Sequence, residues 1–268
     1  MTRTAPPPEV IPASASKWAV SKAKPKGGQR IVIYGGGGKG KTSLAATLPS
    51  PMFIFLGSER PSTDVPNIPN VKSWEDIRAV LREPSLWTGV ESIVIDSATV
   101  AEALAIDFTL RTVKTEKGGV VNSIEGYGYG KGYRHVNETF RQILADLDRH
   151  AEQGRNVVLV VHETIDNTPN PSGEDYKSTQ PNLMQKGEAK LRDLVRDWCD
   201  HMLYIGYDIA VDDGKAKSSG SRCIYTQERA THWAKCRADP AKPVPYSILY
   251  PLGDDAVWHA IGIKKGQK

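Results

Sequence analysis

The chain has 268 residues, of which 39% are hydrophobic and 25% are charged, and its formal net charge is +4 with a pI near 8.8. These values are ordinary for a soluble protein with one α/β core, and no apolar run approaches the roughly 20 residues of a membrane span. The N-terminus lacks the apolar core of a signal peptide, so we expect a cytoplasmic protein that has no membrane partner. The mild positive charge permits a polyanionic partner without demonstrating one.

Residues 1–28 contain Pro6-Pro7-Pro8, many small residues and several lysines, a composition that predicts a flexible tail. Trp18 is an exception, because a tail rarely carries a large aromatic side chain without a use. It docks either on the core of its own chain, which is the simpler alternative, or on a neighbouring subunit.

A glycine-rich loop follows the first predicted strand, 30–34, and precedes a helix-forming segment, 43–48. The loop matches G-x-x-x-x-G-K-[ST], the Walker A pattern, at every fixed position. Glycines let backbone N–H groups turn towards a triphosphate, and the dipole of the following helix favours the anion. The lysine reaches the β and γ phosphates, and the threonine hydroxyl ligates Mg²⁺. The predicted ATP-binding residues are Gly35, Gly36, Gly37, Gly38, Lys39, Gly40, Lys41, Thr42 and Ser43.

Short, wholly apolar strands alternate with helices along the chain, which indicates an α/β fold with a doubly wound, mostly parallel sheet. A capped start at Ser73 and a proline at Pro84 bound the second helix. Predicted strands are 30–34, 52–56, 92–95, 156–161 and 201–207, and predicted helices are 43–48, 73–82, 98–111, 136–147 and 186–199.

Less regular segments separate these elements. Residues 112–132 and 163–185 show no periodicity and are expected to be irregular. A hairpin is expected through 222–225 and 231–235. We assign one core to 29–250 and a C-terminal tail to 251–268, which begins with a peripheral strand or helix.

Three cysteines occur late in the chain, at Cys199, Cys223 and Cys236. They are odd in number and have no C-x-x-C spacing, so we expect reduced thiols. Cys199 is expected to be buried at the end of a helix.

Polar residues at strand ends are the next candidates, because active groups in such sheets gather at the carboxyl ends of the strands. Asp96 closes the apolar strand 92–95, which is the Walker B pattern, and it would share Mg²⁺ with Thr42. Ser97 follows it, so the carboxylate that activates water must lie elsewhere. Glu59, just past the second strand, is the candidate, although it could be a solvated loop residue.

His162 ends the strand 156–161 and is a candidate sensor of the γ-phosphate. The alternative is a histidine that caps the strand and is satisfied by backbone groups. His162-Glu163 is not a zinc motif, because Asp166 stands where the second histidine of H-E-x-x-H would be.

Together these residues resemble the RecA-type ATPase core, and more closely the phage-encoded RecA-like ATPases of the AAA-domain type, including single-strand annealing recombinases. The residues that carry the closer resemblance are Ser-Leu-Ala-Ala-Thr-Leu-Pro at 43–49, Gly-Tyr-Gly-Lys at 128–131 and Lys-x-Arg at 235–237. The resemblance implies DNA-binding loops at 112–132 and 163–185. It also implies that Lys235 and Arg237 reach the ATP of a neighbouring subunit, where an arginine finger contributes about 10³–10⁵ in rate. The alternative is a basic edge strand in solvent.

The segment that precedes the long helix interleaves tyrosines and glycines with basic residues. Tyrosines stack on unpaired bases at about 1–3 kcal/mol each, and basic side chains contact phosphates. The alternative is a flexible loop whose tyrosines fold onto the protein. The second segment offers Lys177, but its four acidic residues, Glu163, Asp166, Glu174 and Asp175, weaken its case as a DNA-binding loop. The predicted DNA-binding residues are Tyr127, Tyr129, Lys131, Tyr133, Arg134 and Lys177.

The sequence and the resemblance thus predict an ATPase with ATP and Mg²⁺ as cofactors that binds single-stranded DNA and supports phage recombination or strand annealing. The expected assembly is a homo-oligomer, a filament or a ring, with ATP sites shared between subunits. A single-strand-binding protein is a further candidate partner. Two alternatives remain: a nucleotide-switched module that binds a replication or packaging protein, and a nucleotide or small-molecule kinase, for which no arginine-rich lid is evident.

Overall fold

The structure is a computed structural model that describes residues 27–61, 63–212 and 215–263. Trp18 and almost all of the expected N-terminal tail lie outside the described residues. In the described part of the chain, nine strands form one sheet with the order β2-β3-β4-β1-β6-β7-β9, while β5 pairs with β4 and β8 pairs with β6. The strands are β1 Arg30–Gly35, β2 Pro51–Phe55, β3 Ser92–Asp96, β4 Asn156–Thr168, β5 Tyr176–Pro181, β6 His201–Asp212, β7 Lys215–Tyr225, β8 Lys235–Cys236 and β9 Ser247–Leu249.

Helices cover both faces of the parallel part of the sheet. Val32 and Tyr34 of β1 pack into a core with α2 to α5, whereas Ile31 and Ile33 pack on the other face with α1 and α6. The predicted doubly wound α/β fold is therefore confirmed. The helices are α1 Lys41–Ala45, α2 Trp74–Leu81, α3 Ala98–Thr112, α4 Lys131–Glu152, α5 Leu191–Trp198 and α6 Ala256–Ala260, with 3₁₀ turns η1 Pro84–Trp87 and η2 Ile124–Tyr127.

The strand register brings the carboxyl ends of the central strands to one level. Gly35 at the end of β1 lies opposite His162 of β4, and Asp96 at the end of β3 lies opposite Val160 of β4 and Phe55 of β2. Side chains that are far apart in the sequence therefore meet at one edge of the sheet.

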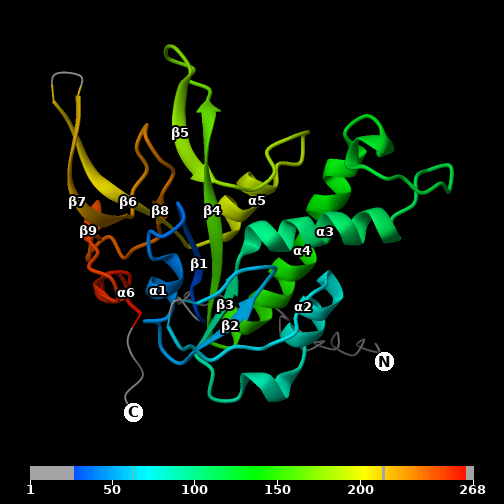
Figure 1. The fold of residues 1–268 in the computed structure, drawn as a ribbon, viewed down its shortest axis with the longest axis horizontal. Helices are drawn as coiled ribbons and strands as arrows, with labels where there is room; N and C mark the ends of the chain where they lie inside the picture. The colour runs from blue at the N-terminus through cyan, green and yellow to red at the C-terminus, as the bar shows by residue number, and fades with distance from the viewer. Residues whose placement is uncertain (1–26, 62, 213–214, 264–268) are drawn as a thin grey trace, which may run out of the picture.

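The expectation of an irregular segment at 163–185 is wrong for most of its length. β4 continues to Thr168 and pairs antiparallel with β5, from Glu163 opposite Pro181 to Thr168 opposite Tyr176. This hairpin projects from the carboxyl edge of the sheet, as the β6–β7 hairpin also does (Figure 1). The residues of β5 are mostly polar even where they are buried, so this strand lacks a continuous apolar run and is not recognisable by that signal.

The late hairpin also differs from the expectation. Residues 222–225 belong to β7, which pairs with β6, and the register sets Tyr204 opposite Tyr225. The expected partner, 231–235, contributes only Lys235 to a strand, and that residue pairs with Met202 at the start of β6. Both segments therefore pair with β6 and not with each other.

The described residues 251–263 pack against the helix that follows the Walker A loop. Trp258 of α6 is buried, and its Nε1 donates to Thr47 Oγ1 at 2.7 Å. Tyr250 donates from its hydroxyl to the carbonyl of Gly40 at 2.9 Å. The expected peripheral helix is thus present and contacts the end of the Walker A helix, while Tyr250, which precedes it, contacts the Walker A loop.

The cysteines match the expectation. Cys199, Cys223 and Cys236 are free thiols, and Cys199 is buried at the C-terminal end of α5. Burial raises the pKa of the Cys199 thiol to about 12, so it stays protonated. Within the described ranges, no helix is long and apolar enough to cross a membrane.

Candidate nucleotide-binding and catalytic site

The Walker A loop connects β1 to α1 and requires glycine at position 35 for lack of space. A Cβ on Gly35 would lie 2.6 Å from the backbone carbonyl oxygen of Ile205, whereas one on Gly36 would meet only the end of the flexible Glu163 side chain, at 2.8 Å from Oε1. Gly38 and Gly40 have φ values of +71° and +93°, which side chains disfavour. The loop can therefore present its backbone to a ligand at close range.

Lys41 and Thr42 open the helix at the end of this loop. Lys41 Nζ donates to the carbonyls of Gly35 and Gly36 at 2.9 Å and 3.0 Å. Burial lowers the pKa of Lys41, while the nearby charge of Asp96 acts in the opposite direction. The ammonium group is thus held at the mouth of the loop.

Asp96 and Thr42 lie in direct contact. Thr42 Oγ1 donates to Asp96 Oδ2 at 2.7 Å, which joins the start of α1 to the end of β3. Asp96 is buried, and burial raises the pKa of its carboxyl against the lowering effect of the Thr42 hydrogen bond. A hydroxyl and a carboxylate side by side are the oxygen donors that Mg²⁺ takes beside a phosphate. The residues present therefore fit a magnesium–nucleotide complex.

Glu59 and His162 are brought together from different strands. Glu59 Oε1 lies 2.8 Å from His162 Nε2 and accepts from Ser97 Oγ at 3.3 Å. Ser97 also caps the start of α3 at Val100 N. The carboxylate is therefore fixed between the ends of β3 and β4, near the Walker residues.

Glu163 is a site residue that the sequence analysis did not assign. Its carboxylate accepts from Lys39 Nζ at 3.0 Å, and the same ammonium lies 5.4 Å from the ring centre of Tyr204. Burial acts to lower the pKa of Lys39, but the Glu163 hydrogen bond and nearby groups raise it overall. Glu163 directly follows His162, so this neighbouring position at the same predicted strand end was the signal that could have found it.

Lys235 and Arg237 lie at the other end of the sheet from the Walker A loop. Lys235 pairs with Met202, close to the start of β1, and its Nζ donates to the carbonyls of Arg196 and Cys199 at 2.9 Å and 2.7 Å. It therefore satisfies the last carbonyls of α5. Arg237 is an exposed side chain that pairs with Asp200 at 2.9 Å.

The three tyrosines that were predicted to bind DNA have different surroundings. Tyr127 donates to the carbonyls of Thr109 and Val113 at 3.1 Å and 2.7 Å, so it folds onto α3. Tyr133 donates to a carboxylate oxygen of Glu125 at 2.7 Å. Tyr129 is fully exposed, at 101% of its reference area. Tyr129 is thus the side chain best placed to stack on a base.

The predicted basic contacts are all partly or wholly open to solvent. Lys131 pairs with Glu116 at 2.5 Å, and Arg134 lies 3.9 Å from Glu138. Lys177 is exposed on β5, in the hairpin and not in an irregular loop. The basic residues therefore divide between two elements.

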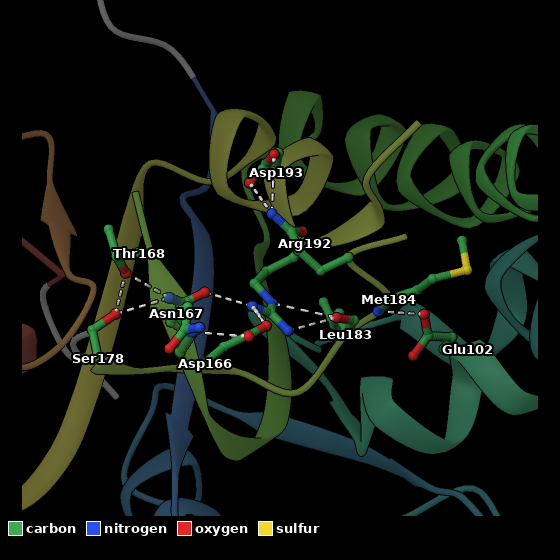
Figure 2. Close-up of polar contacts among 11 residues, drawn as sticks. Glu102, Asp166, Asn167, Thr168, Ser178, Leu183, Met184, Arg192 and Asp193 are labelled. Carbon is green, nitrogen blue, oxygen red and sulfur yellow. Dashed lines mark hydrogen bonds and ion pairs between the residues drawn. The ribbon is translucent and has the colours of Figure 1, made fainter. Parts of the chain in front are cut away.

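A buried arginine holds the base of the β4–β5 hairpin (Figure 2). Arg192 Nη1 donates to Asp166 Oδ2 at 3.0 Å and to Gln180 Oε1 at 2.5 Å, and its other nitrogens donate to the carbonyl of Leu183. Gln180 Nε2 in turn donates to Thr168 and Ser178 hydroxyls. The network joins both hairpin strands to α5.

The next residues along the chain are also held from α3. Glu102 accepts from the backbone N–H of Met184 at 2.7 Å (Figure 2), and Thr99 Oγ1 donates to Asn182 O at 3.3 Å. The helix that begins after Asp96 therefore contacts the segment that follows the hairpin.

A glycine loop between β1 and α1, with Thr42 and Asp96 in contact at the carboxyl edge of a parallel sheet, defines a P-loop nucleotide-binding protein. The family model described as AAA domain matches residues 27–238, and the chain belongs to this family. It is accordingly a P-loop ATPase. No curated protein matches the chain.

A solved structure with a related outline is that of the flagellar accessory protein FlaH from Methanocaldococcus jannaschii. It is 11% identical, and the alignment covers 75% of this chain and 78% of that one with a TM-score of 0.38. This likeness carries no argument about function.

Proposed function

We propose that this ATPase binds single-stranded DNA in response to ATP and supports phage recombination or strand annealing. The observation that carries the proposal is the course of α3, which begins directly after Asp96 and Ser97 and whose C-terminal end accepts hydrogen bonds from Tyr127 of the tyrosine-rich segment, at Thr109 O and Val113 O. That segment presents the fully exposed ring of Tyr129 close to Lys131. Aromatic and basic side chains together suit unpaired bases and their phosphates.

The residues of the loop have distinct roles in this proposal. Lys41 Nζ would hold the β and γ phosphates, and Thr42 Oγ1 with Asp96 would hold Mg²⁺. When bound, the metal ion neutralises charge on the phosphate oxygens. Glu59, fixed by His162 and Ser97, would orient a water molecule and accept its proton at the carboxylate.

Consecutive residues of β4 contact both sides of the nucleotide site. His162 contacts Glu59, and Glu163 contacts Lys39 of the Walker A loop. The β4–β5 hairpin continues directly from these two residues. A change of contacts at either side chain would therefore act on the hairpin, which makes it the proposed element that responds to ATP.

One observation favours a second function, a nucleotide-switched module that binds a protein. Glu174 and Asp175 lie near the tip of the hairpin, and the side chains of Ile165 and Tyr176 are exposed on its strands. Carboxylates repel phosphates, whereas an exposed apolar side chain beside them suits a protein surface. In this alternative the hairpin would bind a partner of replication or packaging, and Lys177 would not contact DNA.

We also propose that ATP sites are shared between subunits of a filament or ring. Within one chain, Lys235 and Arg237 lie at the amino end of β6, so they could serve only the ATP of another subunit. Arg237 is the freer of the two, because Lys235 donates to several carbonyls of α5.

The test is ATP hydrolysis with and without single-stranded DNA at several protein concentrations and salt concentrations. We expect stimulation by DNA that is lost in Tyr129→Ala and kept in Tyr176→Ala, and specific activity that rises with protein concentration. DNA affinity should fall steeply with salt, because phosphate contacts release counterions. Hydrolysis that ignores DNA in every condition would contradict the DNA proposal and favour the protein-binding module.

A further inference from the structure

A second charged site lies on the opposite side of the molecule from the Walker A loop. It is a pocket of about 190 Å³ between η1 and the C-terminal part of α4, next to Arg155, which precedes β4. We propose that this pocket binds a phosphate monoester or inorganic phosphate. The residues that line it are Leu81, Arg82, Pro84, Trp87, Asp146, Arg149, His150, Gln153 and Arg155.

The charge of the pocket is unbalanced. The buried carboxylate of Asp146 accepts from Arg78 Nε at 2.8 Å, Arg82 Nε at 3.0 Å and Arg149 Nη1 at 3.3 Å. Three arginines line the pocket with this one carboxylate, Arg82, Arg149 and Arg155, which leaves an excess of two positive charges among the lining residues; Arg78 contacts Asp146 from outside the pocket. A dianion would neutralise that excess.

Two of these arginines keep donors available to a ligand. The side chains of Arg82 and Arg149 are 47% and 62% exposed, although each has a nitrogen on Asp146. A guanidinium has several N–H donors in a planar fork, which matches two oxygens of a phosphate. The carboxylate holds one nitrogen of each fork, and both side chains line the pocket.

The third arginine of the lining, Arg155, is held by two backbone carbonyls and one side chain. Arg155 Nε donates to Val90 O at 3.2 Å, Nη2 donates to Trp87 O at 3.1 Å, and Nη1 donates to the side chain of Gln153, which also lines the pocket, at 2.5 Å. His150 lies beside it, with Nε2 donating to Leu81 O at 2.7 Å. Burial lowers the pKa of His150, so the imidazole is neutral near pH 7 and adds no charge. A preorganised donor costs little entropy on binding.

The dipole of α4 accounts for only part of this clustering of arginines. The C-terminal end of the helix has a partial negative charge of about half an electron, which is too small to balance the four arginines gathered here, Arg78, Arg82, Arg149 and Arg155. Pro84, Leu81 and Trp87 give the pocket an apolar wall, which lowers the local dielectric and strengthens charge-assisted hydrogen bonds. These features favour a compact, highly charged oxyanion over a large organic ligand.

The test uses the full chain with Lys41→Ala, which removes the lysine that would hold phosphate in the Walker A loop. Inorganic phosphate is titrated at constant ionic strength while the unfolding temperature is measured. We expect a saturable rise in unfolding temperature, and a dissociation constant at least about tenfold higher in Arg149→Gln and higher again in Arg82→Gln/Arg149→Gln. Arg111→Gln, another half-exposed arginine paired with carboxylates, is the matched control and should respond like the parent.

A second arm separates the sources of phosphate. Oligonucleotides with a 5′-phosphate and with a 5′-hydroxyl are compared in the same background. If the 5′-phosphorylated strand binds more tightly than the 5′-hydroxyl strand, and Arg149→Gln abolishes that difference, the pocket binds nucleic-acid ends. If both strands bind equally while inorganic phosphate still raises the unfolding temperature, the pocket binds small phosphates. If phosphate stabilises the parent and both pocket variants equally, or not at all, the proposal is wrong.

Discussion

The β4–β5 hairpin depends on the buried guanidinium of Arg192, and Arg192→Met tests this dependence. The side chain donates to Leu183 O, Gln180 Oε1 and Asp166 Oδ2, and methionine fills similar space without donors. The substitution therefore removes the hydrogen bonds while retaining most of the apolar contacts of the side chain.

The expected loss of stability in Arg192→Met depends on which hydrogen-bond acceptors lose their partner. Leu183 and Gln180 are both buried, and a buried acceptor left unsatisfied costs about 1–3 kcal/mol. The Asp166 side chain is 46% exposed, so water replaces its partner and it adds little. We expect Arg192→Met to lower the free energy of unfolding by about 3 kcal/mol.

Urea denaturation measures this change through the midpoint, with an unchanged slope if the folded core is retained. Arg111→Met is the control, because that exposed arginine pairs with solvated carboxylates and its loss should leave stability close to wild type. The Arg192 hydrogen bond also holds the pKa of Asp166 below its usual range, so the variant should raise that pKa. A loss below about 1 kcal/mol in Arg192→Met would refute the argument that the network stabilises the hairpin.

Three further predictions concern other parts of the molecule. Glu59→Gln should keep ATP binding, measured by calorimetry, and lower phosphate release about 10²- to 10⁴-fold, because the amide cannot accept a proton from water. Burial raises the pKa of Glu102 to about 7 from 4.5, so the stability contributed by its neutral form is present below pH 4.5 and lost as the pH rises through 7. Glu102→Gln should therefore melt higher than wild type at pH 8 and equally at pH 4.5. Trp258→Ala should lower the unfolding free energy by about 3–5 kcal/mol in chemical denaturation, because it empties a buried site between α6 and α1 and removes the bond to Thr47.

Each of these has an outcome that contradicts it. Turnover in Glu59→Gln within about threefold of wild type would remove that carboxylate from catalysis. A constant difference between Glu102→Gln and wild type across this pH range would show that its titration is not linked to folding. A Trp258→Ala variant as stable as wild type would mean that α6 does not support the Walker A helix.

The Walker A loop and Asp96 were recognisable in the sequence because each is a short contiguous pattern on a strand that is buried on both faces. Glu59 and His162 could be predicted as site residues because each follows a predicted strand. Their contact depends on the order of the strands in the sheet, which the sequence does not state. Glu163 was missed because the outer half of β4 is solvated and its side chains alternate without an apolar run.

Side-chain direction was the least predictable feature. The tyrosines of one short segment share a composition, yet Tyr127 donates to backbone carbonyls while Tyr129 is exposed. Lys235 lies on a short edge strand, which agrees with the alternative of a basic edge strand. Its amine does not point freely into solvent, however, because it donates to the carbonyl of Cys199 at the end of α5, 36 residues away in the sequence. Such choices depend on which backbone acceptors the fold leaves free, and that information is tertiary.

The central claim is that the glycine loop holds a magnesium–nucleotide complex through Lys41, Thr42 and Asp96. Calorimetric titration of ATP into the full chain, with and without Mg²⁺, tests it most directly, with exposed Lys242→Ala as the matched control. We predict one saturable, magnesium-dependent site in wild type and Lys242→Ala, binding at least about 100-fold weaker in Lys41→Ala, and no magnesium dependence in Asp96→Asn. Equal ATP affinity in wild type and a folded Lys41→Ala would contradict the account.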